Sequence, residues 1–186
     1  MPHIQVDPNL PGMRSLMAFR PGTAEPMNAL AEILLRSDDS LSRADRELIA
    51  TYVSYLNDCF YCHQSHGEIA VCYLNGNRSL VDDVRNDYTT ADISDKLKAL
   101  LNIAGKVQQS GKSVTSDDVA KARALGATDN DIHDTVLIAA AFCLFNRYVD
   151  GLAATTPTDM SSYPLRAKQI AENGYGNYIY LSKQPA

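Results

Sequence analysis

Two cysteines and a histidine lie close together in the segment from residue 57 to residue 66. Cys59 and Cys62 form a C-x-x-C pair, and His66 follows the second thiol by four residues, about one helical turn. Two thiols at this spacing can close into a disulfide, and an imidazole one turn away can share or remove a thiol proton. The segment therefore predicts a redox centre for thiol-based peroxide or disulfide chemistry.

The same residues share one face if the segment is helical. At about 100° per residue, Cys62 falls about 60° and His66 about 20° from Cys59. A helix N-terminus favours the thiolate, which is the form of cysteine that attacks a peroxide. The attack yields a sulfenic acid, and the second thiol condenses with it to a disulfide. An external dithiol then restores the pair. The dipole favours Cys59 as the attacking thiol, whereas proximity to His66 favours Cys62, so the order stays open. His63 lies on the same face without further support for a role.

Zinc binding is the main chemical alternative. Cys59, Cys62, His66 and Cys72 follow C-x2-C-x3-H-x5-C, close to the spacing of a zinc knuckle. On a continuous helix, however, Cys72 lies about 220° from Cys59 and faces away. We therefore expect Cys72 to be a packed or partly exposed thiol, and Cys143 to be a core residue.

Glu47 is a weaker candidate on spacing alone. It lies twelve residues before Cys59. Its helix projects it about 150° from the middle of the apolar stripe, a position where a glutamate is usually solvated. Spacing by itself therefore predicts a surface residue.

Helical periodicity dominates the chain, and no convincing alternating strand pattern occurs, so we predict a single-domain, all-α helical bundle. Proline and glycine residues predict an extended N-terminal arm over residues 1–22, before an all-α domain over residues 23–186. Capping boxes are expected at Ser42 with Asp45 and at Thr128 with Asp131. The expected helices span residues 24–36, 42–57, 59–74, 80–88, 92–109, 115–125, 128–152 and 165–172. The apolar centre of the 128–152 helix predicts burial by the domain or by another subunit.

Composition excludes several classes of function. The net charge of −5 and the lack of a basic stripe argue against nucleic acid as a partner. The longest apolar run, residues 136–145, is shorter than the about 20 residues that cross a bilayer, so no membrane partner is expected. The first residues lack the features of a signal peptide, so we expect a cytoplasmic protein. In the cytoplasm a C-x-x-C pair is more often catalytic or metal-binding than structural. No Walker loop, G-x-G-x-x-G or G-x-S-x-G motif is present, so no cofactor is predicted.

The chain resembles the alkylhydroperoxidase D-like branch of the carboxymuconolactone decarboxylase family, and more narrowly its uncharacterised peroxidase-related members. The resemblance is carried by residues 41–50, 59–67, 10–12, 19–21 and 145–152. It implies an all-α fold that assembles into trimers or hexamers, with active sites near subunit contacts. It also implies a proton relay in which Glu47, His66, Cys59 and Cys62 act together. In the alkylhydroperoxidase D branch a histidine of the relay precedes the second cysteine, whereas Tyr61 stands here, which puts reduction by lipoyl-protein dithiols in doubt.

Three functional hypotheses follow. The first is an antioxidant oxidoreductase in which the cysteine pair reduces a small-molecule peroxide or a disulfide. An unidentified dithiol or protein reductant then restores the pair, and His66 and Glu47 move the protons. The second is a zinc-binding or interaction module using Cys59, Cys62 and His66. The third is a non-redox decarboxylase or ring-opening enzyme with His66 and Glu47 as acid and base. The cysteine pair favours the first hypothesis.

Overall fold

The fold is all-α, as the sequence predicts. The structure is a computed structural model and describes residues 1–176. Within these residues there are no strands, and the helices are α1 (Met13–Phe19), α2 (Pro21–Arg36), α3 (Arg43–Leu56), α4 (Phe60–Tyr73), α5 (Arg78–Asp87), α6 (Asp95–Gln109), the 3-10 turn η1 (Gly111–Ser113), α7 (Ser116–Ala124), α8 (Asp129–Gly151) and α9 (Ser162–Asn173). Each expected helix has a counterpart in the described chain.

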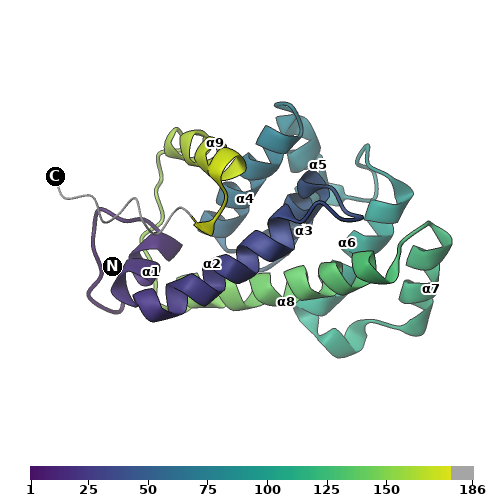
Figure 1. The fold of residues 1–186 in the computed structure, drawn as a ribbon, viewed down its shortest axis with the longest axis horizontal. Helices are drawn as coiled ribbons and strands as arrows, with labels where there is room; N and C mark the ends of the chain where they lie inside the picture. The colour runs from purple at the N-terminus through teal and green to yellow at the C-terminus, as the bar shows by residue number, and fades with distance from the viewer. Residues whose placement is uncertain (177–186) are drawn as a thin grey trace.

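The helix α3 lies at the centre of the bundle, against α4, α6 and α8. Helix α8 runs along the length of the molecule beside α2, while α9 covers α4 on the opposite side (Figure 1). The buried side of α8 supplies Ile138, Phe142 and Phe145 to the core. By length and composition α8 could cross a bilayer, but 44% of its most apolar stretch is buried within the molecule. Its other side remains exposed, with Leu144 at 55% of full exposure.

Local signals start the helices where the sequence places them. Ser42 with Asp45 and Thr128 with Asp131 form the two expected capping boxes, in which each side chain accepts a backbone N–H at the helix start. Pro21 stands at the first position of α2, where a missing N–H costs nothing.

The N-terminal arm differs from the expected extended segment. Residues 13–19 form α1, and α2 begins at Pro21 rather than beyond Gly22. Proline and glycine residues predict breaks in the chain, but Pro21 initiates a helix, and the fully buried Leu16 anchors α1 against the protein. At Gly12, with φ of 53°, a Cβ would lie 2.4 Å from the Tyr61 ring, so only glycine allows the arm to pass this closely. The arm thus covers the start of α4.

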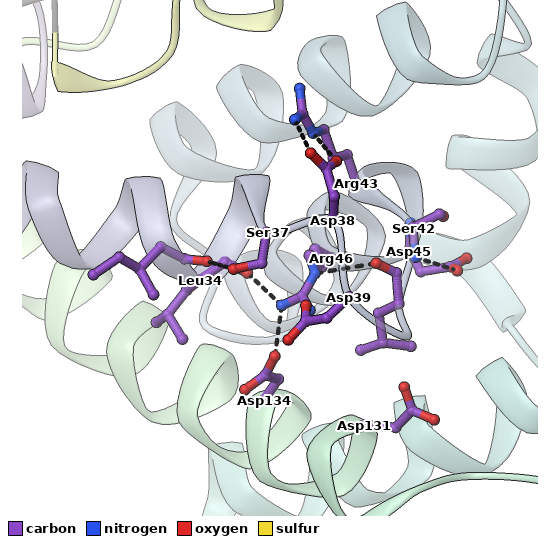
Figure 2. Close-up of polar contacts among 12 residues, drawn as sticks. Leu34, Ser37, Asp38, Asp39, Ser42, Arg43, Asp45, Arg46, Asp131 and Asp134 are labelled. Carbon is purple, nitrogen blue, oxygen red and sulfur yellow. Dashed lines mark hydrogen bonds and ion pairs between the residues drawn. The ribbon is translucent and has the colours of Figure 1, made fainter.

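A buried arginine fixes the start of α3. The Arg46 side chain is completely buried and donates to Asp134 of α8 at 2.8 Å and to Asp39 of the α2–α3 loop at 2.5 Å. It also donates to the backbone carbonyls of Leu34 and Leu41, as Figure 2 shows. Arg46 therefore ties α2, the loop and α8 together immediately before Glu47 in the chain.

Candidate active site

The first turn of α4 carries both thiols of the C-x-x-C pair. Cys59 is the N-cap residue and is fully buried, and Cys62, in the first turn, is 4% exposed. Both are free thiols in the structure. A hydrogen bond with the Cys62 side chain, followed by burial, raises the pKa of Cys59 far above its usual value. Burial and the neighbouring sulfur therefore oppose the effect of the helix N-terminus on the Cys59 thiol.

The turn before α4 is held by polar contacts with α8 and α6. Asp58 has a φ of 57°, which reverses the chain between α3 and α4. The Asn57 amide donates to Asn146 of α8 at 2.8 Å and accepts from Gln108 of α6 at 2.9 Å. Asn146 in turn donates to Ser54 at 3.1 Å. These contacts set the position of the dithiol relative to the bundle.

His66 pairs with Glu47 below the dithiol. The His66 Nδ1 lies 2.8 Å from Glu47 Oε2, and its ring packs edge-on against Phe142 at 4.6 Å. The Glu47 side chain is completely buried. Its second oxygen, Oε1, accepts a hydrogen bond of 2.6 Å from the Tyr175 hydroxyl. A buried carboxylate is thus satisfied by two donors from different elements.

A mainly apolar cavity of about 100 Å³ opens beside the dithiol. Cys62 and His66 both contribute to its wall, whereas Cys59 does not. Arg166 of α9 donates to the Tyr61 hydroxyl at 3.0 Å on the same wall. The remaining lining residues are Met13, Arg14, Met17, Met27, Asn28, Ala31, Ser65, Ile69, Phe142, Phe145, Tyr163, Ala167, Ile170 and Tyr175. A small apolar molecule in this cavity would meet one thiol and one imidazole.

Some candidate residues lie apart from this cavity. The His63 ring packs between Tyr55 and Phe60, and burial together with Arg85 lowers its pKa to about 4. Cys72 is exposed, in accord with its phase on α4, and burial with nearby Glu68 raises its pKa. Cys143 is partly buried and packs against the core.

Glu47 lies where helical phase did not place it. The angle from the apolar stripe predicts a solvent-exposed side chain. The Glu47 side chain is instead buried, because His66 and Tyr175, which follows α9, cover that face of α3. Sequence analysis missed Tyr175 and Arg166 altogether. Both follow α8 and meet α3 or α4 only through the fold, and neither lies in a motif that could have revealed it.

The zinc alternative gains no support from this geometry. Over residues 1–176, no three side chains of His, Cys, Asp or Glu converge to hold a metal ion. Cys72, the fourth residue of the knuckle-like spacing, is exposed on α4, while Cys59 is buried.

Comparisons with known proteins agree with the fold. The model of the carboxymuconolactone decarboxylase family matches residues 21–72. A structure from Ralstonia eutropha JMP134, described as an alkylhydroperoxidase D core and an uncharacterised peroxidase-related protein, is 30% identical, with a TM-score of 0.74 over 81% of this chain and 79% of that chain. The chain belongs to the alkylhydroperoxidase D-like branch of this family.

Further structures extend the likeness to this branch. An uncharacterised peroxidase-related protein from Silicibacter sp. TM1040 is 27% identical, with a TM-score of 0.72 over 81% of this chain and 76% of that chain. A protein of unknown function from Agrobacterium tumefaciens shares the fold at 17% identity, with a TM-score of 0.67 over 86% of this chain and 100% of that chain. No curated protein matches the chain. In this alkylhydroperoxidase D-like chain, the matched segment contains Glu47, both cysteines of the C-x-x-C pair and His66.

Proposed function

We propose that the protein is a thiol-dependent peroxidase that reduces hydroperoxides through Cys62 and Cys59. The observation that carries the proposal is that Cys62 and His66 face one apolar cavity while Cys59 lies behind Cys62 and is hydrogen-bonded to it. The peroxidase-related description of the relatives from Ralstonia and Silicibacter supports the same chemistry.

The two thiols take different parts in this reaction. The Cys62 thiolate attacks the terminal oxygen of the O–O bond, so the sulfur becomes a sulfenic acid and the alkoxide leaves and takes up a proton. The Cys59 thiol then gives up its proton and its sulfur attacks that sulfenic sulfur. The S–O bond breaks, the disulfide forms, and the sulfenic hydroxyl leaves with the Cys59 proton as water. An external dithiol reduces the disulfide to two thiols and is itself oxidised.

His66 and Glu47 move the protons in this proposal. With Glu47 Oε2 at Nδ1, the His66 ring has Nε2 available to take the Cys62 proton and pass it to the leaving alkoxide. Glu47 keeps the imidazole in the required tautomer and stabilises its charged form. The same dithiol would serve a disulfide as oxidant, so disulfide reduction remains within the proposal.

Peroxide consumption with a dithiol reductant tests the proposal. We expect Cys62→Ser to lose more than about 100-fold of the rate. Cys59→Ser should keep one turnover, which traps a sulfenic acid on Cys62 that mass spectrometry detects, but lose steady-state turnover. Cys72→Ser is the matched control, because that thiol is exposed and outside the cavity. Equal peroxide consumption by the wild type, Cys62→Ser and Cys59→Ser would refute the proposal.

We also propose a homo-oligomer, the trimer or hexamer that the family resemblance implies, assembled through α2 and α8. Helices α2 and α8 contact each other, and each exposes a large apolar side chain. Ile33 of α2 is 65% exposed and Leu144 of α8 is 55% exposed, and burial of both in a subunit contact would remove this apolar surface from water. Light scattering after gel filtration tests this proposal. We expect Leu144→Glu to lower the oligomeric state. Leu165 of α9 is 66% exposed but lies outside the proposed contact, so Leu165→Glu should leave the oligomeric state unchanged. A wild-type monomer at micromolar concentration would contradict the proposal.

A further inference from the structure

The chain returns to the active site after α9. Gly174 ends α9 with a φ of 80°, and a Cβ there would lie 2.6 Å from a carboxylate oxygen of Glu32. The next backbone N–H, that of Tyr175, donates to Glu32 Oε2 at 2.6 Å. The segment is therefore anchored on α2, and the Tyr175 side chain enters the protein beside the cavity.

The Tyr175 phenol contacts both members of the Glu47–His66 pair. Its hydroxyl donates to Glu47 Oε1 at 2.6 Å and lies 3.3 Å from His66 Nδ1. Its ring stacks on the imidazole, with the centroids 6.0 Å apart and the planes at 18°. Burial and the Glu47 carboxylate raise the pKa of Tyr175 well above its usual value. The phenol therefore keeps its proton and acts on Glu47 as a donor.

These contacts constrain the proton on His66. Glu47 Oε1 is occupied by the phenol, so Oε2 is the oxygen that faces the imidazole. A carboxylate has no proton to donate, so Nδ1 must carry the hydrogen of this bond, and Nε2 is left as the basic nitrogen. Without the phenol, the carboxylate would be held by one donor alone and could rotate away from the imidazole.

We propose that Tyr175 is a positioning residue of the active site, which orients Glu47 and thereby determines which nitrogen of His66 carries the proton. The inference rests on the proposed function for its effect on the reaction rate, but its effect on His66 does not depend on peroxide chemistry. The other charged or titratable groups around this cluster are Arg14 on α1, Glu32 and Arg36 on α2, Tyr61, Cys62, Cys72 and Tyr73 on α4, and Tyr163 and Arg166 on α9.

Nitrogen-15 NMR of the histidine side chains, followed as a function of pH, tests the inference directly. In the wild type we expect neutral His66 to carry its proton on Nδ1. In Tyr175→Phe the carboxylate loses a donor and binds a proton more readily, so the Glu47–His66 pair should take up its proton at a pH about one unit higher. In an active enzyme the acid limb of kcat/KM should move in the same direction, with KM for the peroxide nearly unchanged.

Tyr73→Phe is the matched control. The Tyr73 hydroxyl accepts from Arg36 at 2.7 Å and donates to the Ala171 carbonyl of α9 at 3.4 Å, outside the cavity. Because its hydroxyl binds Arg36 and Ala171 rather than Glu47 or His66, this variant should loosen α9 and move the His66 titration much less than Tyr175→Phe does. An unchanged titration in Tyr175→Phe, or an equal shift in Tyr73→Phe, would overturn the inference.

A measurement on the wild type alone covers the case in which Tyr175→Phe does not fold. The Tyr175 ring carbon that bears the hydroxyl should show no ionisation up to about pH 11, whereas titration at the ordinary tyrosine value of about 10 would overturn the inference. A protein that consumes no peroxide ends the proposed function but leaves both titrations readable. An unchanged His66 titration in an active enzyme ends only the inference about Tyr175.

Discussion

At the scale of single residues, the site depends on a carboxylate that the protein removes from water. Glu47 is fully buried, and such a group is tolerated only where donors satisfy its oxygens. His66 and Tyr175 do so from α4 and from beyond α9. The carboxylate thus lies beside the imidazole of His66, which lines the same cavity as Cys62.

Replacing this carboxylate by an amide should invert the His66 tautomer. In Glu47→Gln the one acceptor oxygen can serve Tyr175 or His66, and when it serves Tyr175 the amide N–H faces Nδ1. The imidazole proton then moves to Nε2, so the ring cannot take a proton from Cys62. We expect kcat/KM for peroxide to fall by about 100-fold or more, in stopped-flow measurements.

Glu68→Gln provides the control for that substitution. Glu68, on α4, is buried like Glu47, but it pairs with Arg78 and does not line the cavity. For Glu68→Gln, kcat/KM for peroxide should stay within about twofold of the wild-type value even if the melting temperature falls. Equal rates for Glu47→Gln and the wild type would show that the carboxylate takes no part.

At the scale of elements, the α3–α4 turn decides where the dithiol lies. Asp58 takes up the left-handed conformation, and Asn57 joins the turn to α6 and α8 through side-chain amides. Asn146 is 1% exposed and links this network to Ser54 of α3. The contacts are polar and buried, so each partner left alone carries a desolvation cost.

Asn146→Ala should therefore disturb stability and site together. Removing the amide leaves Ser54 without its donor and leaves the Asn57 amide nitrogen only the weaker Cys143 sulfur acceptor at 3.7 Å. We expect a loss of about 1–3 kcal/mol in the free energy of unfolding. Urea denaturation measures this loss, and peroxide turnover should fall as α4 loses its register. Asn9→Ala, at an exposed bond to Asp7 in the N-terminal arm, should change neither quantity measurably.

Arg46 acts on another pair of elements, and Arg43 offers a comparison three residues away. Arg46→Met removes the side chain that joins Asp39 of the α2–α3 loop to Asp134 of α8 (Figure 2). The free energy of unfolding should fall by about 3 kcal/mol, because Asp134 is left half-enclosed and two backbone carbonyls lose their donor. Arg43→Met breaks a pair with exposed Asp38 and should cost less than about 1 kcal/mol. Equal losses in thermal denaturation would contradict the structural assignment.

At the scale of the whole molecule, segments from both ends of the described chain meet over one helix start. The arm covers Cys59, Tyr61 and Cys62 with Leu16, and Tyr163 of α9 packs in the same cluster. The dithiol is thus enclosed by segments more than 100 residues apart in the chain, so access to it depends on the complete fold.

Global stability should fall in mild acid because of His63. Its pKa in the folded protein is about 4, below the usual 6.5, since burial and Arg85 oppose the charged ring. The unfolded chain therefore binds this proton first, and the stabilisation present above pH 6.5 is lost as the pH falls from 6.5 toward 4. Free energies of unfolding at pH 7, 5.5 and 4.5 should reveal the slope.

His63→Phe should reduce that slope. The phenyl ring can keep the packing against Tyr55 and Phe60, and His63 Nδ1 has no hydrogen-bond partner to lose. His133→Gln should leave the slope unchanged, because the His133 side chain is 70% exposed. A slope that survives in His63→Phe would assign the acid sensitivity to other groups.

Local interactions explain what could be predicted without coordinates. The helices, the capping boxes at Ser42 and Thr128, and the placement of Cys62 and His66 on one face of α4 all follow from contacts within four residues of each other. Such contacts are set by helix geometry, which the order of residues determines directly. The all-α fold and the dithiol with its histidine therefore followed from the sequence.

Only the tertiary structure decided which of these residues face each other. Glu47 is buried because Tyr175, 128 residues later in the chain, covers it. His63 and His66 have different surroundings because His63 packs on Tyr55 and His66 packs on Phe142. The arm turns helical where Leu16 finds a buried position. Burial depends on partners distant in sequence, and helical phase describes one element at a time, so phase alone could not reveal that solvent is excluded from Glu47.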